Sequence, residues 1–346
     1  MRQTMRTICR SVRNIADPSH DNPPHSLMRL ILSCSIACVV PMVASTQQPQ
    51  QHVQLRIGLI TAGERAAPAA ASIARGVRLG AAESKQTAQL FGDDVQLFEA
   101  AGVGATAEAA ADNLLSANKI EILIGTSAAD AEALSRFSEA HRILFLNAAS
   151  RSQSVRNRCN RHTFHVEATD AMYSMAGRQG KVAPSPAVAR SLGARADSIV
   201  LWSSMLERFG ASQINDRYRD KYGTGMDGGA WAGWAAVKFG AEAALRARSD
   251  SPAKLLTYLE SPATQFDGHK GWPLTFRLRD HQLRQPLYMV AAPSAGTGKP
   301  SVRDIPDLRA HSSSSTSSDR GGRASDRILD SLMSAGAHDC SWSNGR

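Results

Sequence analysis

The chain reads IEILIGTSAADAEALSRFSEAH from Ile120 to His141, a short apolar run followed by a longer periodic one. Ile120–Ile124 has the length and the β-branched side chains of a buried strand, and Ala128–His141 has the spacing of a helix. A loop of three small residues, Gly125 to Ser127, joins them. A strand, a short loop and a helix in this order predict one repeat of a parallel α/β sheet.

The same alternation continues on both sides of this unit. The expected strands of the first half are Leu55–Ile60, Val95–Ala100, Ile120–Ile124, Ile143–Leu146 and Thr163–Val166, and the expected helices are Pro68–Lys85, Thr106–Ala117 and Ala128–His141. Strands that alternate with helices form βαβ units, whose right-handed crossovers cover both faces of the sheet. The first half therefore predicts a doubly wound parallel sheet of the α/β class.

The second half holds fewer strand patterns. Its expected strands are Ser198–Trp202, Leu274–Leu278 and Leu287–Ala292, and its expected helices are Met205–Tyr222, Gly229–Arg248 and Ala253–Leu259. So small a sheet can bury only a modest core. Beyond Pro293 the chain is rich in Pro, Gly and Ser, and we expect disorder over Ala295–Ser325 and an isolated helical turn at Ile328–Met333.

Composition and charge exclude several classes of protein. The 346 residues are 42% apolar and 21% charged, enough to bury a sizeable core. The net charge is +9, and it is +6 without residues 1–45, which hold five Arg and two Asp. This surplus is ordinary for a chain of this length, and no basic stripe with interleaved aromatic residues accompanies it. A nucleic-acid partner is therefore not indicated.

The apolar stretch Leu30–Val40 is about eleven residues long, whereas a helix needs about 20 to cross a bilayer. Arg29 precedes it and the small residues 43–45 follow it, which is the order of a secretory signal peptide. We expect cleavage after these small residues and export of the remaining chain. Met28 is an alternative start to Met1, and a buried core helix is the alternative interpretation of the stretch.

Two cysteines, Cys159 and Cys340, remain after such a cleavage. An oxidising compartment would permit a disulfide between them. The sequence leaves the pairing open, because nothing in it places the two Cα atoms within bonding range. No Cys or His pair has the spacing of zinc ligands, and we expect no metal or other cofactor.

Loops at the carboxyl ends of parallel strands are where open α/β sheets bind ligands. Thr126 and Ser127 follow the third expected strand and place hydroxyls and free backbone N–H groups at the positive end of a helix, which suits a carboxylate. Ala149 and Ser150 follow the fourth strand and add a hydroxyl and a small residue that lets a ligand approach. The first such loop is Thr61–Arg65. The alternative is that Thr126 or Ser127 caps the helix without a ligand.

One glycine-containing motif is a candidate for a nucleotide-binding site. Residues Gly102 to Ala107 match G-x-G-x-x-A after an expected strand. The acid that would bind the ribose is Glu121, but it stands at the start of the next strand instead of its end, so a simple strand-to-helix turn is the alternative. The sequence contains neither G-x-S-x-G nor H-E-x-x-H, so an enzyme is not indicated.

Several runs carry a family resemblance. Arg56–Ile60, Ile73–Ala81, Ile122–Gly125 and Thr163–Val166 resemble the first lobe of the type 1 periplasmic binding proteins, the leucine/isoleucine/valine-type receptors of ABC importers. Three later runs are similar to the branch of that family associated with quinoprotein (pyrroloquinoline quinone) alcohol dehydrogenase systems, namely Trp231–Lys238, Gln265–Gly271 and Gln282–Leu287.

The resemblance implies two lobes that close on a small ligand, a periplasmic location, delivery to an inner-membrane ABC permease, and no catalysis. It implies that the ligand's carboxylate is held by Thr126, Ser127, Ala149 and Ser150. The sequence departs from the family at Gln179–Asp197, where a short segment replaces most of the second lobe.

The expected organisation is a signal peptide with an upstream extension at 1–45, a first ligand-binding lobe at 54–172, a truncated second lobe at 173–293 and a disordered Ser-rich tail at 294–346. The expected function is that of a periplasmic solute-binding component of an ABC importer, which binds an amino acid or another small carboxylated metabolite. Two alternatives stay open: a degenerate binding fold without a ligand that acts through protein contacts, and a nucleotide-dependent enzyme.

Overall fold

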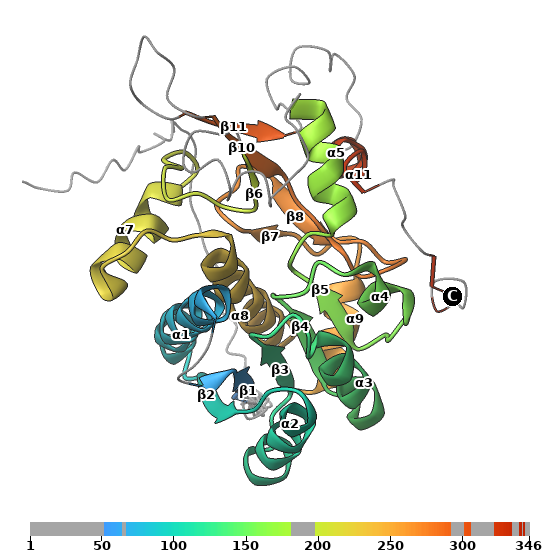
Figure 1. Ribbon diagram of the computed structural model, residues 1–346. Coiled ribbons are helices and arrows are strands. Elements are labelled where there is room, and N and C mark those ends of the chain that lie inside the picture. The colour runs from blue at the N-terminus through green and yellow to red at the C-terminus, as the bar shows by residue number, and fades with distance from the viewer. Residues whose placement is uncertain are drawn as a thin grey trace, which may run out of the picture. The chain divides into compact units, whose positions relative to one another are not determined.

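The strand patterns of the first half form one five-stranded sheet. The computed structural model describes residues 52–63, 67–180, 198–291, 301–305, 322–333, 339–340 and 342. The strands of this sheet are β1 (Gln54–Thr61), β2 (Asp94–Ala101), β3 (Ile122–Gly125), β4 (Leu144–Asn147) and β5 (Thr163–His165). All neighbouring strands are parallel, in the order β2-β1-β3-β4-β5 (Figure 1). The predicted doubly wound sheet is confirmed, and its switch point lies between β1 and β3.

Successive side chains of the strands enter two different cores. Ile57 and Leu59 of β1 pack with α1 (Pro68–Gln89) and α8 (Gly228–Ala247) on one face. Leu123 of β3 and Phe145 of β4 pack with α2 (Ala105–Asn118) and α3 (Ala131–His141) on the other face. Figure 1 shows these two helix pairs on opposite sides of β1 and β3. Both faces are therefore covered, as a parallel sheet requires.

Helix α8 comes from the second half of the chain and yet packs on the first sheet. A Cβ atom built on Gly240 of α8 would lie 2.6 Å from Cδ1 of Ile122 in β3. Helix α8 therefore lies on the first sheet, although its residues fall in the range 173–293 that was expected to form the second lobe. The chain from Pro49 onward forms one compact unit. Helix α9 (Pro252–Glu260) follows α8, as predicted.

The second sheet is small. It consists of β6 (Ser198–Val200), β10 (Leu287–Ala291) and β11 (Ser301–Ile305) in the order β11-β10-β6, and both pairings are antiparallel. Helix α5 (Asp170–Gly180) packs against this sheet, and α7 (Ala211–Tyr222) lies beside α1. The predicted incomplete second lobe corresponds to this unit of three strands in the described part of the chain.

A third, antiparallel sheet contains β7 (Phe266–Asp267), β8 (Pro273–Phe276) and β9 (Leu283–Arg284). Helix α11 (Gly322–Asp330) packs on it, and Nε of Arg284 donates a hydrogen bond to Oδ1 of Asp330 at 2.9 Å. A single bridge between His165 and Gln282 connects the end of β5 to the residues before β9.

Four sequence-based expectations need correction. The predicted disorder of Ala295–Ser325 is wrong at 301–305, which pair with β10 as β11, and at 322–325, which begin α11. The helix predicted from Met205 begins at Ala211, because Phe209 and Gly210 both have positive φ angles, which interrupt a helix. The helix predicted from Ala128 begins at Ala131. The residues Ile328–Met333, expected to form an isolated helical turn, are the end of α11 and the turn after it, and α11 is not isolated because it packs on the third sheet.

Residues 1–45, with the predicted signal peptide, lie outside the described residues, as does most of the predicted Ser-rich tail. No helix in the described ranges combines the length and the apolar character that a membrane span needs.

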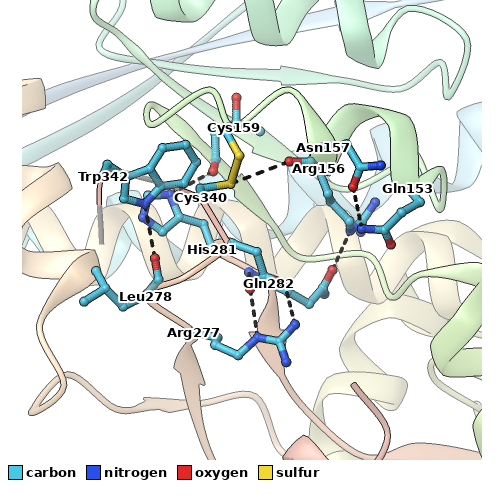
Figure 2. The surroundings of a disulfide bond; sticks show 12 residues. Gln153, Arg156, Asn157, Cys159, Arg277, Leu278, His281, Gln282, Cys340 and Trp342 are labelled. Carbon is cyan, nitrogen blue, oxygen red and sulfur yellow. Dashed lines mark hydrogen bonds and ion pairs between the residues drawn. A yellow bond between two sulfur atoms is a disulfide. The ribbon is translucent and has the colours of Figure 1, made fainter. Parts of the chain in front are cut away.

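The disulfide that the sequence left open is present. Cys159, just after α4 (Gln153–Asn157), bonds to Cys340, with 5.4 Å between their Cα atoms (Figure 2). The backbone N–H of Cys340 donates to the carbonyl oxygen of Arg279 at 2.9 Å. Nε1 of Trp342 donates to the carbonyl oxygen of Leu278 at 3.2 Å, and the Trp342 ring lies beside that of His281. The disulfide thus links Cys340 to the loop before β5, an outer strand of the first sheet.

Candidate functional site

A cavity of about 670 Å³ opens at the carboxyl ends of the parallel strands, where ligands of such sheets bind. Its wall combines the start of α1, the loops after β3, β4 and β5, and the start of α8. The described lining residues are Ala69, Ile73, Ala128, Ala129, Ala149, Ser150, Arg151, Ser152, Glu167, Asp170 and Gly229. Small apolar residues form much of this wall, and the charged groups come from the loops after β4 and β5.

Two of the four predicted site residues, Ala149 and Ser150, line this cavity. Their backbone N–H groups donate to Oδ1 of Asn147, at 3.3 and 2.8 Å. The sequence suggested that such backbone groups could bind a carboxylate, but here the Asn147 amide already accepts from them. The Ser150 hydroxyl oxygen accepts from the N–H of Ser152 at 3.3 Å, so its own proton can be donated to a ligand.

Asn147 is itself fixed by its neighbours. Its Nδ2 donates to the carbonyl oxygen of Ser150 at 2.9 Å and lies 3.1 Å from Nδ1 of His165. Burial lowers the pKa of His165 well below its usual value, so the ring is neutral and Nδ1 can accept this hydrogen bond. The lone histidine of β5 therefore shapes the loop after β4 and does not line the cavity.

The other two predicted residues lie elsewhere. Thr126 lines a second cavity of about 570 Å³ near Arg75 and Tyr222, and its N–H donates to the carbonyl oxygen of Ile60 at 3.0 Å. Ser127 lines neither of these cavities. Asp130 takes the N-cap position of α3, so Thr126 and Ser127 do not cap the helix. The structure thus brings Ala149 and Ser150 together and separates them from Thr126 and Ser127.

Sequence reasoning missed Arg151, which also lines the cavity. The centre of its guanidinium group lies 3.9 Å from the centroid of the Tyr173 ring, and its Nε lies 3.7 Å from Oε1 of Glu167. Glu167 is buried, and its Oε1 accepts from the N–H of Ala168 at 2.9 Å and from the Tyr173 hydroxyl at 2.8 Å. Burial raises the pKa of the Glu167 carboxyl, although Arg151 and Tyr173 act in the opposite direction.

A second arginine, Arg156, holds the loops in place from behind. Its buried guanidinium group donates to the carbonyl oxygens of Ser150, Ser152 and Glu167 at 3.2, 2.8 and 2.7 Å. It also donates to Oε1 of Gln282 at 2.7 Å (Figure 2). Burial lowers the pKa of Arg156 to about 10, so the group is still protonated at neutral pH. These bonds tie the loops after β4 and β5 to the segment before β9.

The glycine motif forms a strand-to-helix turn. The N–H of Gly104 donates to Oδ1 of Asp130 at 2.9 Å, so this backbone group already has an anionic partner. Glu121, the acid that a ribose would require, accepts from the backbone N–H of Arg56 at 2.7 Å and from the Arg56 side chain. Glu121 lies at the amino end of β3, whereas Gly104 follows the carboxyl end of the parallel strand β2. The structure thus gives no support to a nucleotide site here.

Within the described ranges, no group of three or more His, Cys, Asp or Glu residues could hold a metal ion.

Comparison with known proteins gives matches among solved structures only. No family model matches the chain, and no curated protein matches it. LivJ of Streptococcus pneumoniae, a branched-chain amino acid transporter substrate-binding protein in complex with isoleucine, matches with a TM-score of 0.57 and 14% identity. This match covers 72% of our chain and 99% of LivJ. A solute-binding protein of an ABC transporter from Rhodopseudomonas palustris, in complex with benzoate, has the same TM-score and identity over 71% of our chain and 95% of its own.

A third match is the leucine-, isoleucine-, valine-, threonine- and alanine-binding protein from Brucella ovis in its closed conformation. Its TM-score is 0.59 at 11% identity, over 72% of our chain and 94% of the Brucella protein. Identities this low concern the fold alone. The parallel sheet in the order β2-β1-β3-β4-β5 and these matches show that the chain has the fold of the type 1 periplasmic binding proteins, the fold seen in leucine/isoleucine/valine-binding proteins of ABC transporters.

Proposed function

We propose that this protein is the periplasmic solute-binding component of an ABC importer and binds an amino acid or another small carboxylated metabolite without catalysis. The observation that carries the proposal is the cavity at the carboxyl ends of β4 and β5, which is lined by Ser150 and Arg151. Its volume of about 670 Å³ suits a small molecule. Solved proteins of the same fold hold isoleucine and benzoate.

The proposal includes export through the signal peptide at 1–45 and delivery of the ligand to an inner-membrane permease. It also includes ligand contacts by Thr126, Ser127, Ala149 and Ser150, of which Ala149 and Ser150 have the stronger support because they line the main cavity. The lobes would be 54–172 and 173–293, with α8 and α9 returning from the second range to the first sheet. Membership of the quinoprotein-associated branch is part of the same proposal.

A binding fold that has lost its ligand is the second candidate. The observation that favours it is the small second sheet, β11-β10-β6, which leaves less protein to close over a ligand. A ligand covered from one side only would keep much of its hydration, whereas typical sites bury most of the ligand's surface.

Thermal unfolding with added compounds separates the two candidates. The test uses protein purified from the periplasm of an expression host, so that recovery there also checks export. Amino acids and small organic acids are added one at a time. A ligand at 100 times its dissociation constant adds about 2.7 kcal/mol to the free energy of unfolding, so we expect one compound to raise the melting temperature by several degrees. A cooperative melt that no compound shifts would favour the second candidate.

A further inference from the structure

The Arg151 side chain differs in its hydrogen bonds from three other arginines near the first sheet. Arg56 donates to Glu121, Arg161 donates to Glu260, and Arg156 donates to three carbonyl oxygens and to Gln282. Among the described residues, the Arg151 side chain has one ion-pair neighbour and one aromatic neighbour, but it donates no hydrogen bond to either. Its N–H groups are therefore available to an acceptor in the cavity.

The surroundings hold this group in one orientation. The guanidinium carbon lies over the Tyr173 ring, 3.9 Å from the ring centroid, which is within the range of a cation–π contact. The Nε atom faces Oε1 of Glu167 at 3.7 Å, beyond hydrogen-bond distance. Tyr173 in turn donates its hydroxyl to Glu167, which keeps the ring in place. A guanidinium group that donates no hydrogen bond within the described residues is well suited to a planar carboxylate, which can accept two parallel hydrogen bonds.

The rest of the cavity suggests the body of the ligand. Five of its lining residues are small or apolar: Ala69, Ile73, Ala128, Ala129 and Gly229. This part of the wall offers apolar contact and no polar side chain. At Gly229 a Cβ atom would lie 3.2 Å from Cγ1 of Ile73, so this part of the wall is already closely packed. A compact apolar group fits here better than an extended polar one.

We propose that Arg151 determines the ligand specificity of this site: its guanidinium group donates paired hydrogen bonds to the carboxylate of a small ligand whose apolar body contacts the wall formed by α1 and α8. The inference rests on the proposed solute-binding function and makes it more specific. Tyr173 does not line the cavity and acts as a positioning residue beneath the guanidinium group, and Glu167, in the cavity wall, accepts the Tyr173 hydroxyl and keeps the ring in place.

The test compares each acid with its amide, which lacks the carboxylate charge. Titration calorimetry on the full exported protein measures the binding of benzoate and benzamide, and of L-isoleucine and L-isoleucinamide. Each compound is added up to about 10 mM, so that weak binding is detected as well. The wild type should bind at least one acid about 10-fold or more tightly than its amide. Arg151→Met should lose about 10- to 100-fold in affinity for that acid and keep its affinity for the amide. Arg151→Lys should fall between, because a lysine keeps the charge without the planar pair of donors.

Arg219→Met is the matched control, because Arg219 lies on the exposed side of α7 and lines neither cavity at the carboxyl ends of the strands. It should bind like the wild type. A melting temperature for each variant confirms that it is folded. To test the positioning role, Tyr173→Phe should weaken binding of the acid less than Arg151→Met does, since the ring beneath the guanidinium group remains.

Each outcome decides something. If an acid binds the wild type and Arg151→Met equally, or if acid and amide bind the wild type equally, Arg151 does not select the carboxylate and the inference fails, whereas the solute-binding function stands. If neither acid binds the wild type, the inference fails as well. The proposed function is then judged separately by the wider thermal panel, where any other compound that shifts the melt would support it.

Discussion

At the residue scale, single buried charges do much of the positioning. Glu260, at the end of α9, is buried and accepts from both Nε and Nη2 of Arg161, at 2.8 and 2.9 Å, while Nε2 of His281 lies 3.3 Å from its Oε1. Burial alone would raise the pKa of this carboxyl, but Arg161 and His281 outweigh it and lower the pKa from 4.5 to about 2. Glu260 thereby links the loop before β5 to the end of α9.

This gives a prediction for acid stability. A carboxyl whose pKa is lowered on folding stabilises the protein above its unfolded pKa, and this contribution is lost as the pH falls from about 4.5 towards 2. We expect Glu260→Gln to be less stable than the wild type at pH 7, by up to about 3 kcal/mol, and the difference to shrink towards pH 2. Urea unfolding at several pH values measures it. Glu132→Gln, at an ion pair near the surface with Arg158, is the control and should change little.

Residue-scale features were also the hardest to predict from the sequence. Ala149 and Ser150 were found because small and hydroxyl residues after a strand are a local signal. Arg151 stands directly beside them, but nothing local marks which of the chain's 40 basic residues lines a cavity. Its role depends on Tyr173 and Glu167, whose placement follows from the fold. Thr126 lines a different cavity from Ala149 and Ser150, and both cavities have residues of α1 in their walls.

At the element scale, α1 and α8 form the closest helix contact of the described structure. A Cβ atom on Gly76 would lie 1.9 Å from the carbonyl oxygen of Ala230, and one on Gly233 would lie 2.3 Å from that of Ile73. Each glycine therefore allows the backbone of one helix to contact the other directly. Both helices were predicted from their periodicity, but their contact was not, because no pattern within either helix names its neighbour.

Two glycine substitutions test this contact. Gly76→Ala should lower the free energy of unfolding by about 2 kcal/mol or more, because the methyl group meets backbone atoms that cannot move away without separating the helices. Gly240→Ala should be nearly neutral, because its methyl group meets the flexible end of Ile122 and a gain in helix propensity of about 1 kcal/mol offsets the crowding. Denaturant unfolding of the two variants compares these values. Equal losses would show that close helix approach is not the cause.

At the scale of the whole molecule, the chain order and the spatial order differ. The five parallel strands could be predicted because each is a local apolar run between helices. The return of α8 to the first sheet, the strand β11 in a polar segment and the bond between Cys159 and Cys340 all join residues that are distant in the sequence. A pattern confined to a short window carries no information on such pairings, which explains why they were missed or left open.

The disulfide permits a test at this scale. It joins residues 181 apart, so its removal frees a long loop in the unfolded chain. We expect Cys159→Ser with Cys340→Ser to lower the free energy of unfolding by about 2–5 kcal/mol. A reducing agent should lower the melting temperature of the wild type to that of the double variant and leave the variant unchanged. A wild-type melt that does not respond to reduction would argue against the bond.

The bridge at the end of β5 affects whether another protein chain can pair with this outer strand. An outer strand with free backbone groups is a template on which another chain can pair. On β5 the N–H of His165 donates to the carbonyl oxygen of His281 at 2.9 Å, and Nε2 of Gln282 donates to the carbonyl oxygens of His165 and Glu167. The segment at 281–282 thus occupies backbone groups at the end of β5 and protects this side of the sheet against edge-to-edge aggregation.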